Sequence, residues 1–272
     1  MFTLSKYPRN IVAGAIIAIS TCAALNTFAS PVFEIDPTSN GFSSIGSAFT
    51  ADSIHGGSST RSINVGGTNY ASTGYIAFTG FTNSGSPVGA GTTGLTVDYG
   101  LYGLFTQTFS CPTLLSSGVT CAVTGITFSL YGDPGFLNTY NSASILNNPI
   151  VTDVGGNDVL LGKASLVVGG LAGLNALGGA FENVNTDFAL TSAGSNYFID
   201  PVPFYNLAFS EFNNTSAGIQ CNTPGCVNST AVAINNQTGS IDFNKVPEPA
   251  MPSLFGLGLA GLAFVRKYSI KG

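Results

Sequence analysis

The feature of this sequence that most constrains its fold is a series of short segments in which apolar and polar residues alternate. In LTVDYGLYGLF, the positions that share one face are Leu95, Val97, Tyr99, Leu101, Gly103 and Phe105. The same period of two recurs at Ile126, Phe128 and Leu130. Successive side chains of a β-strand point to opposite faces, so this period is typical of strands with one buried face.

Further strand-like runs are rich in β-branched and aromatic residues and are bounded by Gly, Asn, Ser or Pro. They are YIAFT (75–79), NLAFSEFN (206–213) and SIDFN (240–244). Many short strands with frequent turns predict an all-β fold, an antiparallel β-sandwich or a barrel-like body. The segment LLGKASLVVGGLAGLNALGGAF (160–181) is ambiguous. Its apolar run is compatible with a buried strand, and its glycines argue against a long helix.

The cysteines predict disulfides. Apart from Cys22 near the start, the chain has Cys111, Cys121, Cys221 and Cys226, and four cysteines allow three connectivities. The local pairs Cys111–Cys121 and Cys221–Cys226 are favoured, because a Ser-Ser-Gly turn and a Pro-Gly turn lie inside the two loops. A zinc site is disfavoured because neither spacing is the two-residue kind, and an oxidising compartment would preserve the disulfides.

The first 29 residues have the layout of a secretory signal peptide. Lys6 and Arg9 precede an apolar stretch over 11–25, and small residues lead to a cleavage site after Ala29. A membrane anchor is the alternative, but the apolar run is short for one. Lipidation at Cys22 is a further alternative, although Thr21 is a poor neighbour for a lipidated cysteine.

The other end of the chain has an apolar run followed by basic residues. Residues 251–265 are apolar or small apart from Ser253. As a helix they would span roughly 22 Å, against about 30 Å for the hydrocarbon core. Arg266, Lys267 and Lys271 could extend the span by snorkelling and favour the cytoplasmic side as a basic stop. We therefore expect a transmembrane-type helix and basic tail over 253–272; a buried C-terminal helix is the alternative.

Just before this run stands Val246-Pro247-Glu248-Pro249-Ala250. This motif, the apolar helix and the basic end together resemble the PEP-CTERM sorting signal of Gram-negative bacteria. The resemblance implies recognition of Pro247, Glu248 and Pro249 by an exosortase, which cleaves near the motif. It also implies transient tethering to the inner membrane, then transfer to the cell surface or extracellular matrix. The two prolines keep the predicted linker over 244–252 extended.

The rest of the chain resembles the flocculation-associated PEP-CTERM proteins over about residues 32–250. The most similar patches are FEIDPTS (33–39) and LTSAGSNYFIDPVPFYNLAFSEFN (190–213). This resemblance implies a secreted surface or matrix protein that cells need in order to aggregate in exopolysaccharide. No catalytic residues come with that family.

Charge excludes some partners. Between Ser30 and Pro249, three basic residues against thirteen acidic ones leave a formal charge of −10; the basic ones are Arg61, Lys163 and Lys245. Nucleic-acid binding needs clustered Lys and Arg, so no nucleic-acid partner is expected. Apolar and aromatic content is high enough for a packed fold, which we expect as one β-rich body over 30–243.

Candidate chemistry is sparse. His55 lies near Asp52 and Ser53, but hydrolase triads are assembled by the fold rather than by adjacency, so an exposed loop histidine is expected. The turn from Asp153 to Asp158 offers calcium only part of a ligand shell, so a plain turn between strands is expected. No catalytic residue, metal or cofactor is expected.

Four aromatic residues could stack on sugar rings or belong to the core; they are Tyr197, Phe198, Phe204 and Tyr205. The sequons that begin at Asn213, Asn228 and Asn236 are attributed to chance. The sequence thus predicts a non-catalytic exported protein that promotes aggregation with extracellular polysaccharide. The alternatives are an exopolysaccharide-binding module and a secreted glycan hydrolase.

Overall fold

The computed structural model describes residues 31–245. The predicted signal peptide, the PEP tripeptide and the predicted helix over 253–272 lie outside the described residues. Within 31–245, no helix has the length and apolarity needed to cross a membrane.

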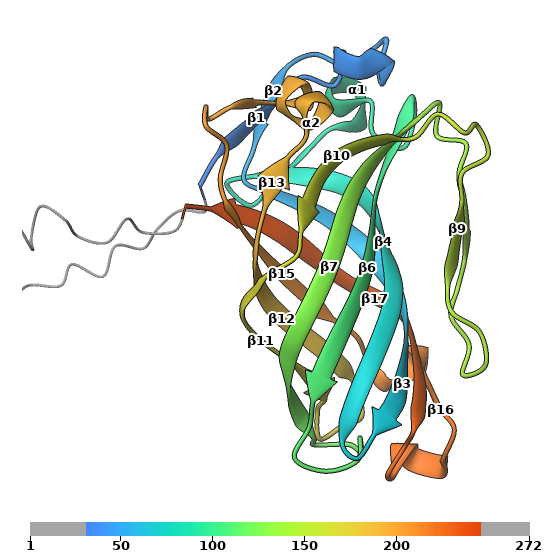
Figure 1. Cartoon of the computed structure of the whole chain (residues 1–272). Coiled ribbons are helices and arrows are strands. Elements are labelled where there is room, and N and C mark those ends of the chain that lie inside the picture. The colour runs from blue at the N-terminus through green and yellow to red at the C-terminus, as the bar shows by residue number, and fades with distance from the viewer. Residues whose placement is uncertain (1–30, 246–272) are drawn as a thin grey trace, which may run out of the picture.

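Eight strands form a closed antiparallel barrel (Figure 1). They are β3 (Ser53–Gly66), β4 (Asn69–Asn83), β6 (Tyr99–Ser110), β7 (Thr120–Pro134), β11 (Val167–Leu174), β12 (Ala180–Asp187), β15 (Leu207–Asn213) and β17 (Ala231–Asn244). Each pairs with the next along the chain, and β17 pairs back to β3. The predicted all-β class is confirmed, and of its two forms the chain adopts the barrel.

The ambiguous segment over 160–181 is extended. Strand β10 (Val159–Ala164) pairs with the later part of β7, at residues 128–132. Strand β11 pairs with the start of β7, at residues 120–122. The two are separated at Ser165 and Leu166, whose backbone N–H groups both donate to Asp187 Oδ1, at 2.7 and 2.8 Å. A two-residue strand, β13 (Ala189–Leu190), covers the other edge of β10. Between β10 and β11, the carboxylate of Asp187 thus accepts the hydrogen bonds that a neighbouring strand would otherwise accept.

The alternating residues of β6 and β7 point into the barrel. Leu101 and Phe105 are buried, as are Phe128 and Leu130. Gly103 also occupies an inward position. A larger residue would not fit there, because a Cβ would lie 2.3 Å from Phe128 Cε2. Small and large residues therefore alternate across the interior, as in other small barrels.

The predicted strand over 95–105 begins later than the alternation suggested. Strand β6 starts at Tyr99, because Thr96 takes a positive φ of 63° and the backbone N–H of Val97 donates to Gly94 O. Leu95 is buried, but Val97 is 57 % exposed. The first positions of the pattern therefore belong to a turn after α1 (Ala90–Thr93).

One end of the barrel, here called the aromatic pole, comprises residues 31–52, 84–98 and 188–206. Its elements are β1 (Phe33–Ile35), η1 (Ser39–Gly41), β2 (Phe49–Ala51), β5 (Ser86–Val88), α2 (Ser192–Tyr197) and β14 (Phe198–Asp200). Strands β14, β1 and β2 form a small separate sheet. Phe243, at the end of β17, contacts the rings of Phe33, Phe198 and Phe204 at centroid distances of 5.1 to 5.7 Å. Aromatic packing thus closes this end.

The opposite end, here called the disulfide pole, comprises residues 66–69, 111–119, 175–179 and 214–230. It includes η2 (Ser216–Gly218), β16 (Ile219–Cys221) and η3 (Pro224–Cys226), seen at the bottom of Figure 1. The long connection from β7 to β10 carries the hairpin of β8 (Thr139–Asn141) and β9 (Ile150–Thr152) and lies on the outside of the barrel. Arg61 Nε donates to Ile145 O at 3.0 Å, which holds this connection against β3.

Phe243→Ala tests the aromatic closure. We expect the free energy of unfolding to fall by about 3–5 kcal/mol, because the ring is 1 % exposed and its loss leaves a cavity. Urea unfolding of the secreted protein measures this, with Leu146→Ala as control because Leu146 is 78 % exposed. Equal stability of the two variants would contradict the closure.

Candidate functional site

Both predicted disulfides are present, and both lie at the disulfide pole. Cys111–Cys121 joins the end of β6 to the start of β7, with 4.1 Å between the two Cα atoms. Cys221–Cys226 closes the short connection between β16 and η3, with a Cα–Cα distance of 5.2 Å. The two cysteine pairs, remote from each other in sequence, therefore rigidify neighbouring loops.

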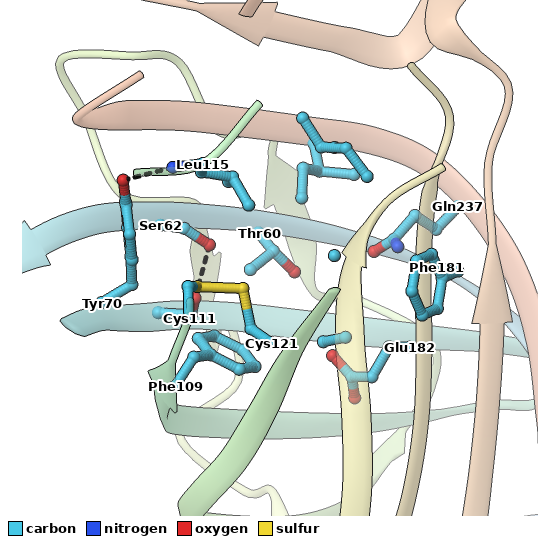
Figure 2. A pocket seen from close by; sticks show the side chains of 15 residues that line it. Thr60, Ser62, Tyr70, Phe109, Cys111, Leu115, Cys121, Phe181, Glu182 and Gln237 are labelled. Atoms are coloured by element: carbon cyan, nitrogen blue, oxygen red, sulfur yellow. Dashed lines mark hydrogen bonds between the residues drawn. A yellow bond between two sulfur atoms is a disulfide. The ribbon is translucent and has the colours of Figure 1, made fainter. Parts of the chain in front are cut away.

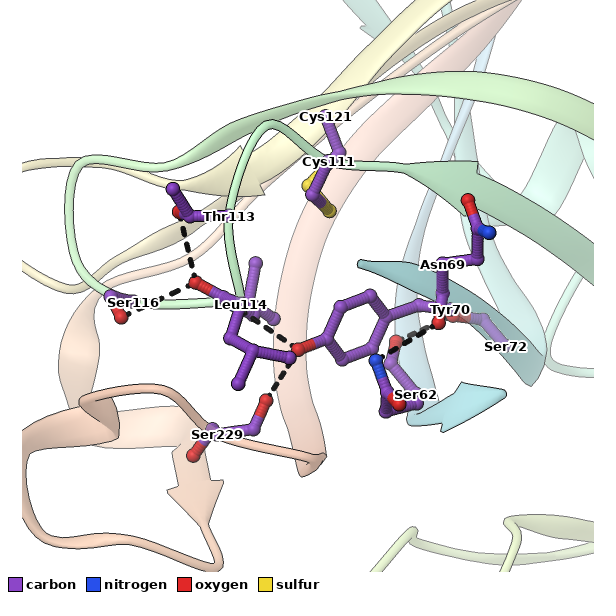
Figure 3. Close-up of a disulfide and its surroundings, with 12 residues drawn as sticks. Ser62, Asn69, Tyr70, Ser72, Cys111, Thr113, Leu114, Ser116, Cys121 and Ser229 are labelled. Atoms are coloured by element: carbon purple, nitrogen blue, oxygen red, sulfur yellow. Dashed lines mark hydrogen bonds between the residues drawn. A yellow bond between two sulfur atoms is a disulfide. The ribbon is translucent and has the colours of Figure 1, made fainter. Parts of the chain in front are cut away.

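Tyr70 of β4 links these two loops (Figure 3). Its buried hydroxyl donates to Ser229 O at 2.6 Å and accepts from the backbone N–H of Leu115 at 2.9 Å. The N–H of Ser229 donates to Leu115 O at 2.8 Å, and that of Asn228 donates to Ser116 Oγ at 2.8 Å. The disulfide pole is thus one hydrogen-bonded unit.

Beneath this unit the barrel encloses a cavity of about 40 Å³ (Figure 2). Tyr70 and the Cys111–Cys121 disulfide border one side, and Gln237 and Glu182 border another. A second cavity of about 30 Å³ also touches Glu182. One water needs roughly 10–15 Å³ by this measure, so these spaces fit a few waters and are too small for a sugar or a cofactor.

Among the acidic residues of the described range, Glu182 is the one that lines these two cavities. Its carboxylate borders the cavities, so part of it is accessible from inside although protein surrounds it. Gln107 Nε2 donates to Glu182 Oε1 at 2.9 Å. Burial raises the pKa of Glu182, and the bond from Gln107 offsets this only in part. Gln107 Oε1 is buried without a partner in the described structure.

Glu182 was not among the candidate residues predicted from the sequence. The sequence signal that could have identified Glu182 is its place in an alternating run. It is an acidic residue at an inward position, between the buried residues Ala180 and Val184 of β12. A second perturbed acid, Asp242, lies on the outer face of β17. Burial, with Asp52 and Glu211 nearby, raises the pKa of Asp242 to about 6.

His55 does contact Ser53, but not in a triad geometry. It lies in β3 rather than in the expected loop, and its Nε2 is 2.8 Å from Ser53 Oγ and 3.0 Å from Thr82 Oγ1. Asp52 accepts from Thr82 Oγ1 at 3.0 Å. A triad needs the carboxylate on the other ring nitrogen of the histidine, so this network lacks the orienting contact.

The carboxylates at the two ends of the Asp153–Asp158 turn are engaged within the protein. Asp153 Oδ1 accepts from the N–H of Gly156 at 2.6 Å. Asp158 Oδ2 accepts from Tyr102 Oη at 2.6 Å and from Asn138 Nδ2 at 2.8 Å. Over the described range, no group of three or more His, Cys, Asp or Glu residues could hold a metal ion. The segment is a turn between β9 and β10.

The predicted aromatic candidates belong to the aromatic pole. Tyr197 and Phe198 are buried, and Tyr197 Oη is 2.7 Å from Tyr99 Oη. Phe204 and Tyr205 are partly buried and pack against the core. These rings close the barrel and do not form an exposed platform.

Comparison with known proteins identifies the end of the chain. Residues 245–267 match the family described as the PEP-CTERM protein-sorting motif. The matched range includes Pro247, Glu248 and Pro249 and the basic residues Arg266 and Lys267, while Lys271 lies beyond it. No curated protein and no solved structure matches the chain. The chain therefore carries the motif that marks an exported protein for exosortase processing and sorting to the cell surface.

Tyr70→Phe tests the link between the disulfide loops. Removing the hydroxyl leaves the buried N–H of Leu115 and the carbonyl of Ser229 each one partner short, so we expect a loss of about 1–3 kcal/mol of unfolding free energy. Urea denaturation measures it. The control is Tyr131→Phe, whose ring stacks on Tyr102 and should be nearly neutral. The link is refuted if both variants unfold like the wild type.

Glu182→Gln tests the buried acid. Its folded pKa is raised, so above the unfolded value near 4.5 the wild type loses up to about 1.4 kcal/mol of stability per pH unit until the folded group ionises. The amide carries no such loss. We expect the variant to match the wild type near pH 4 and to be increasingly more stable towards pH 7, measured by urea unfolding at each pH.

The control for this series is Asp200→Asn, because Asp200 is exposed at the end of β14 and is not among the groups that raise the pKa of Asp242. The raised pKa of Asp242 also lowers the stability of every variant as the pH rises to about 6. This contribution is the same in each variant, so it cancels when their unfolding free energies are compared. A constant difference between Glu182→Gln and wild type across pH 4–7 would show that Glu182 is ionised inside the barrel.

Proposed function

We propose that this protein is a non-catalytic structural component of the extracellular matrix that promotes cell aggregation, as flocs or biofilm, together with exopolysaccharide. The observation that carries the proposal is the joining of a surface-sorting motif to a closed, disulfide-bridged barrel. The motif accounts for export, and the barrel supplies a durable folded body outside the cell.

The barrel suits a long-lived extracellular role. Closure pairs the strands on both sides, so long free edges that would recruit other chains are removed. Disulfides persist in oxidising surroundings. The interior holds only small cavities, so its contribution is mechanical rather than that of a substrate chamber.

Processing by exosortase also fits the position of the motif. Strand β17 ends at Asn244, and Pro247 follows three residues later. An extended chain advances at most about 3.3–3.6 Å per residue, so the motif starts within roughly 10 Å of the folded body. We propose that the protein is held at the inner membrane by its tail only until the chain is cut near Glu248.

A secreted glycan hydrolase is less well supported. The histidine of the described body contacts two hydroxyl groups through one ring nitrogen, and Asp52 contacts Thr82 instead of the imidazole. An exopolysaccharide-binding module is compatible with the structural role, because a matrix component that grips polysaccharide also holds cells together.

The test is deletion of the gene, followed by complementation. Deletion should disperse the flocs, and wild-type protein should restore them. Matrix protein should begin near Ser30 and lack Lys271, as read from its mass. Glu248→Ala should leave uncut precursor in the inner membrane and fewer flocs, whereas Glu211→Ala should behave as wild type.

Two results would overturn parts of the proposal separately. Intact flocs after deletion would refute the role in aggregation. Matrix protein that still carries Lys271, or normal processing of Glu248→Ala, would refute release by cleavage at the motif.

A further inference from the structure

The disulfide pole carries no charged side chain. None of residues 66–69, 111–119, 175–179 or 214–230 is Asp, Glu, Lys or Arg. Acidic residues gather instead at and beside the aromatic pole, at Glu34, Asp36, Asp52, Asp98 and Asp200. The barrel is therefore electrically asymmetric along its axis, with one neutral end and one acidic end.

The neutral end lies opposite the end of the barrel at which the described chain stops. Strand β17 runs from the disulfide pole to the aromatic pole, so the chain leaves the barrel at the acidic end, where Lys245 Nζ lies 6.0 Å from the ring centroid of Tyr205. The 14 residues of β3, at about 3.3 Å each and tilted by 35–45°, separate the poles by roughly 35 Å. The disulfide pole is thus the end remote from the point where the sorting tail begins.

A groove of about 420 Å³ opens at this remote end. It is lined by Ser117, Ser216 and Thr223, by Leu177 and Ile219, and by the Cys221–Cys226 disulfide. Its volume lies within the 300–1,000 Å³ typical of ligand sites, and it is more than ten times that of either interior cavity.

Three loops converge at the groove and are held before any ligand arrives. A Cβ on Gly178 would lie 3.3 Å from Ser117 Oγ and 3.7 Å from Ser216 Cβ, so these loops touch. Asn175 Oδ1 accepts from the N–H groups of Leu177 and Gly179, at 2.9 and 3.0 Å. A preorganised site loses less conformational entropy on binding.

The lining offers hydroxyl groups beside apolar surface. The hydroxyls of Ser117 and Ser216 make no hydrogen bond within residues 31–245, so they are available to a ligand. Leu177 is 89 % exposed next to them. A sugar ring presents the same combination, with hydroxyls at its rim and C–H groups on its faces, and each side-chain hydroxyl can both donate and accept.

We propose that this groove binds a neutral polysaccharide chain, an inference that rests on the proposed matrix function. An uncharged lining provides no counter-charge for a carboxylate, sulfate or phosphate group. The acidic remainder of the body, with twelve acids against three bases over residues 31–245, repels polyanions at longer range. The neutral fraction of the matrix is therefore the ligand that the groove fits.

The experiment uses mature protein recovered from the matrix and the exopolysaccharide of the same culture, split by anion exchange into neutral and acidic fractions. Binding is measured by co-sedimentation at 0.05 and 0.5 M NaCl. We expect saturable binding to the neutral fraction that salt hardly changes, because screening acts on charges. Ser117→Glu and Leu177→Asp should weaken it by about tenfold or more, since each places a charge against sugar.

Matched control variants introduce the same acidic side chains at exposed positions outside the groove. Ser47→Glu lies at the aromatic pole and Leu146→Asp in the outer connection, and both residues are exposed. Both should bind like wild type. Unchanged secretion, circular dichroism and absence of free thiols establish that each groove variant is folded.

The proposal is overturned if only the acidic fraction binds, if neither fraction binds, or if groove and control variants bind equally. It is also overturned if the groove variants lose a protein partner while keeping polysaccharide binding. Flocs that vanish on deletion but persist with normally secreted Leu177→Asp would refute the groove and leave the matrix function standing.

Discussion

The pairing of β11 with β7 is the interaction on which the rest of the structure depends. It consists of three residue pairs, and it converts an open sheet into a barrel. Ala172 pairs with Cys121, so the Cys111–Cys121 disulfide lies at the seam. A Cβ on Gly173 would lie 2.2 Å from Val119 O, so only glycine allows this approach. Without the seam, β11 and the start of β7, which β10 does not cover, would be unprotected edges.

Closure also determines where function can lie. Eight strands leave an interior just wide enough for side chains, and polar groups enclosed there must satisfy one another. Ser58 Oγ donates to Gln237 Oε1 at 2.8 Å, and Gln107 bonds Glu182. Little volume remains for a ligand. The outer surface and the two poles are therefore the parts of the described body that a partner can reach.

Local signals in the sequence predicted much of this fold. Alternation identified the inward faces of β6 and β7, and turn residues inside the cysteine loops identified both disulfides, because these features depend on neighbours in the chain. The choice of barrel over sandwich depended on the pairing of β11 with β7, whose partners lie about 50 residues apart, and a period of two is the same in either fold. Thr96 shows the limit of periodicity, since its positive φ ended the pattern before β6 began.

The site was less predictable than the fold for the same physical reason. The Tyr70 hydroxyl joins Leu115 to Ser229, which lie 114 positions apart in the sequence, and no local pattern encodes that contact. The role of Glu182 follows only from knowing which face of β12 is enclosed. His55 looked isolated because its partner Thr82 comes from β4, across the ladder. The motif at residues 245–267 was readable because it is a continuous stretch of local sequence.

Closure of the barrel is also compatible with the low content of charged residues. A closed barrel has no long edge that needs lysines or prolines for protection, so its surface can be built from hydroxyl side chains. On the outer faces of β6 and β7, Thr106 bonds Thr127 at 2.6 Å and Thr108 bonds Thr124 at 2.9 Å across the ladder. Such cross-strand pairs stabilise a sheet without charge. Disulfides and the Tyr70 contacts order the neutral loops at the far pole, where ion pairs are absent from residues 66–69, 111–119, 175–179 and 214–230. A pole can therefore remain uncharged and still be rigid, because covalent and hydrogen-bonded links replace the ionic ones.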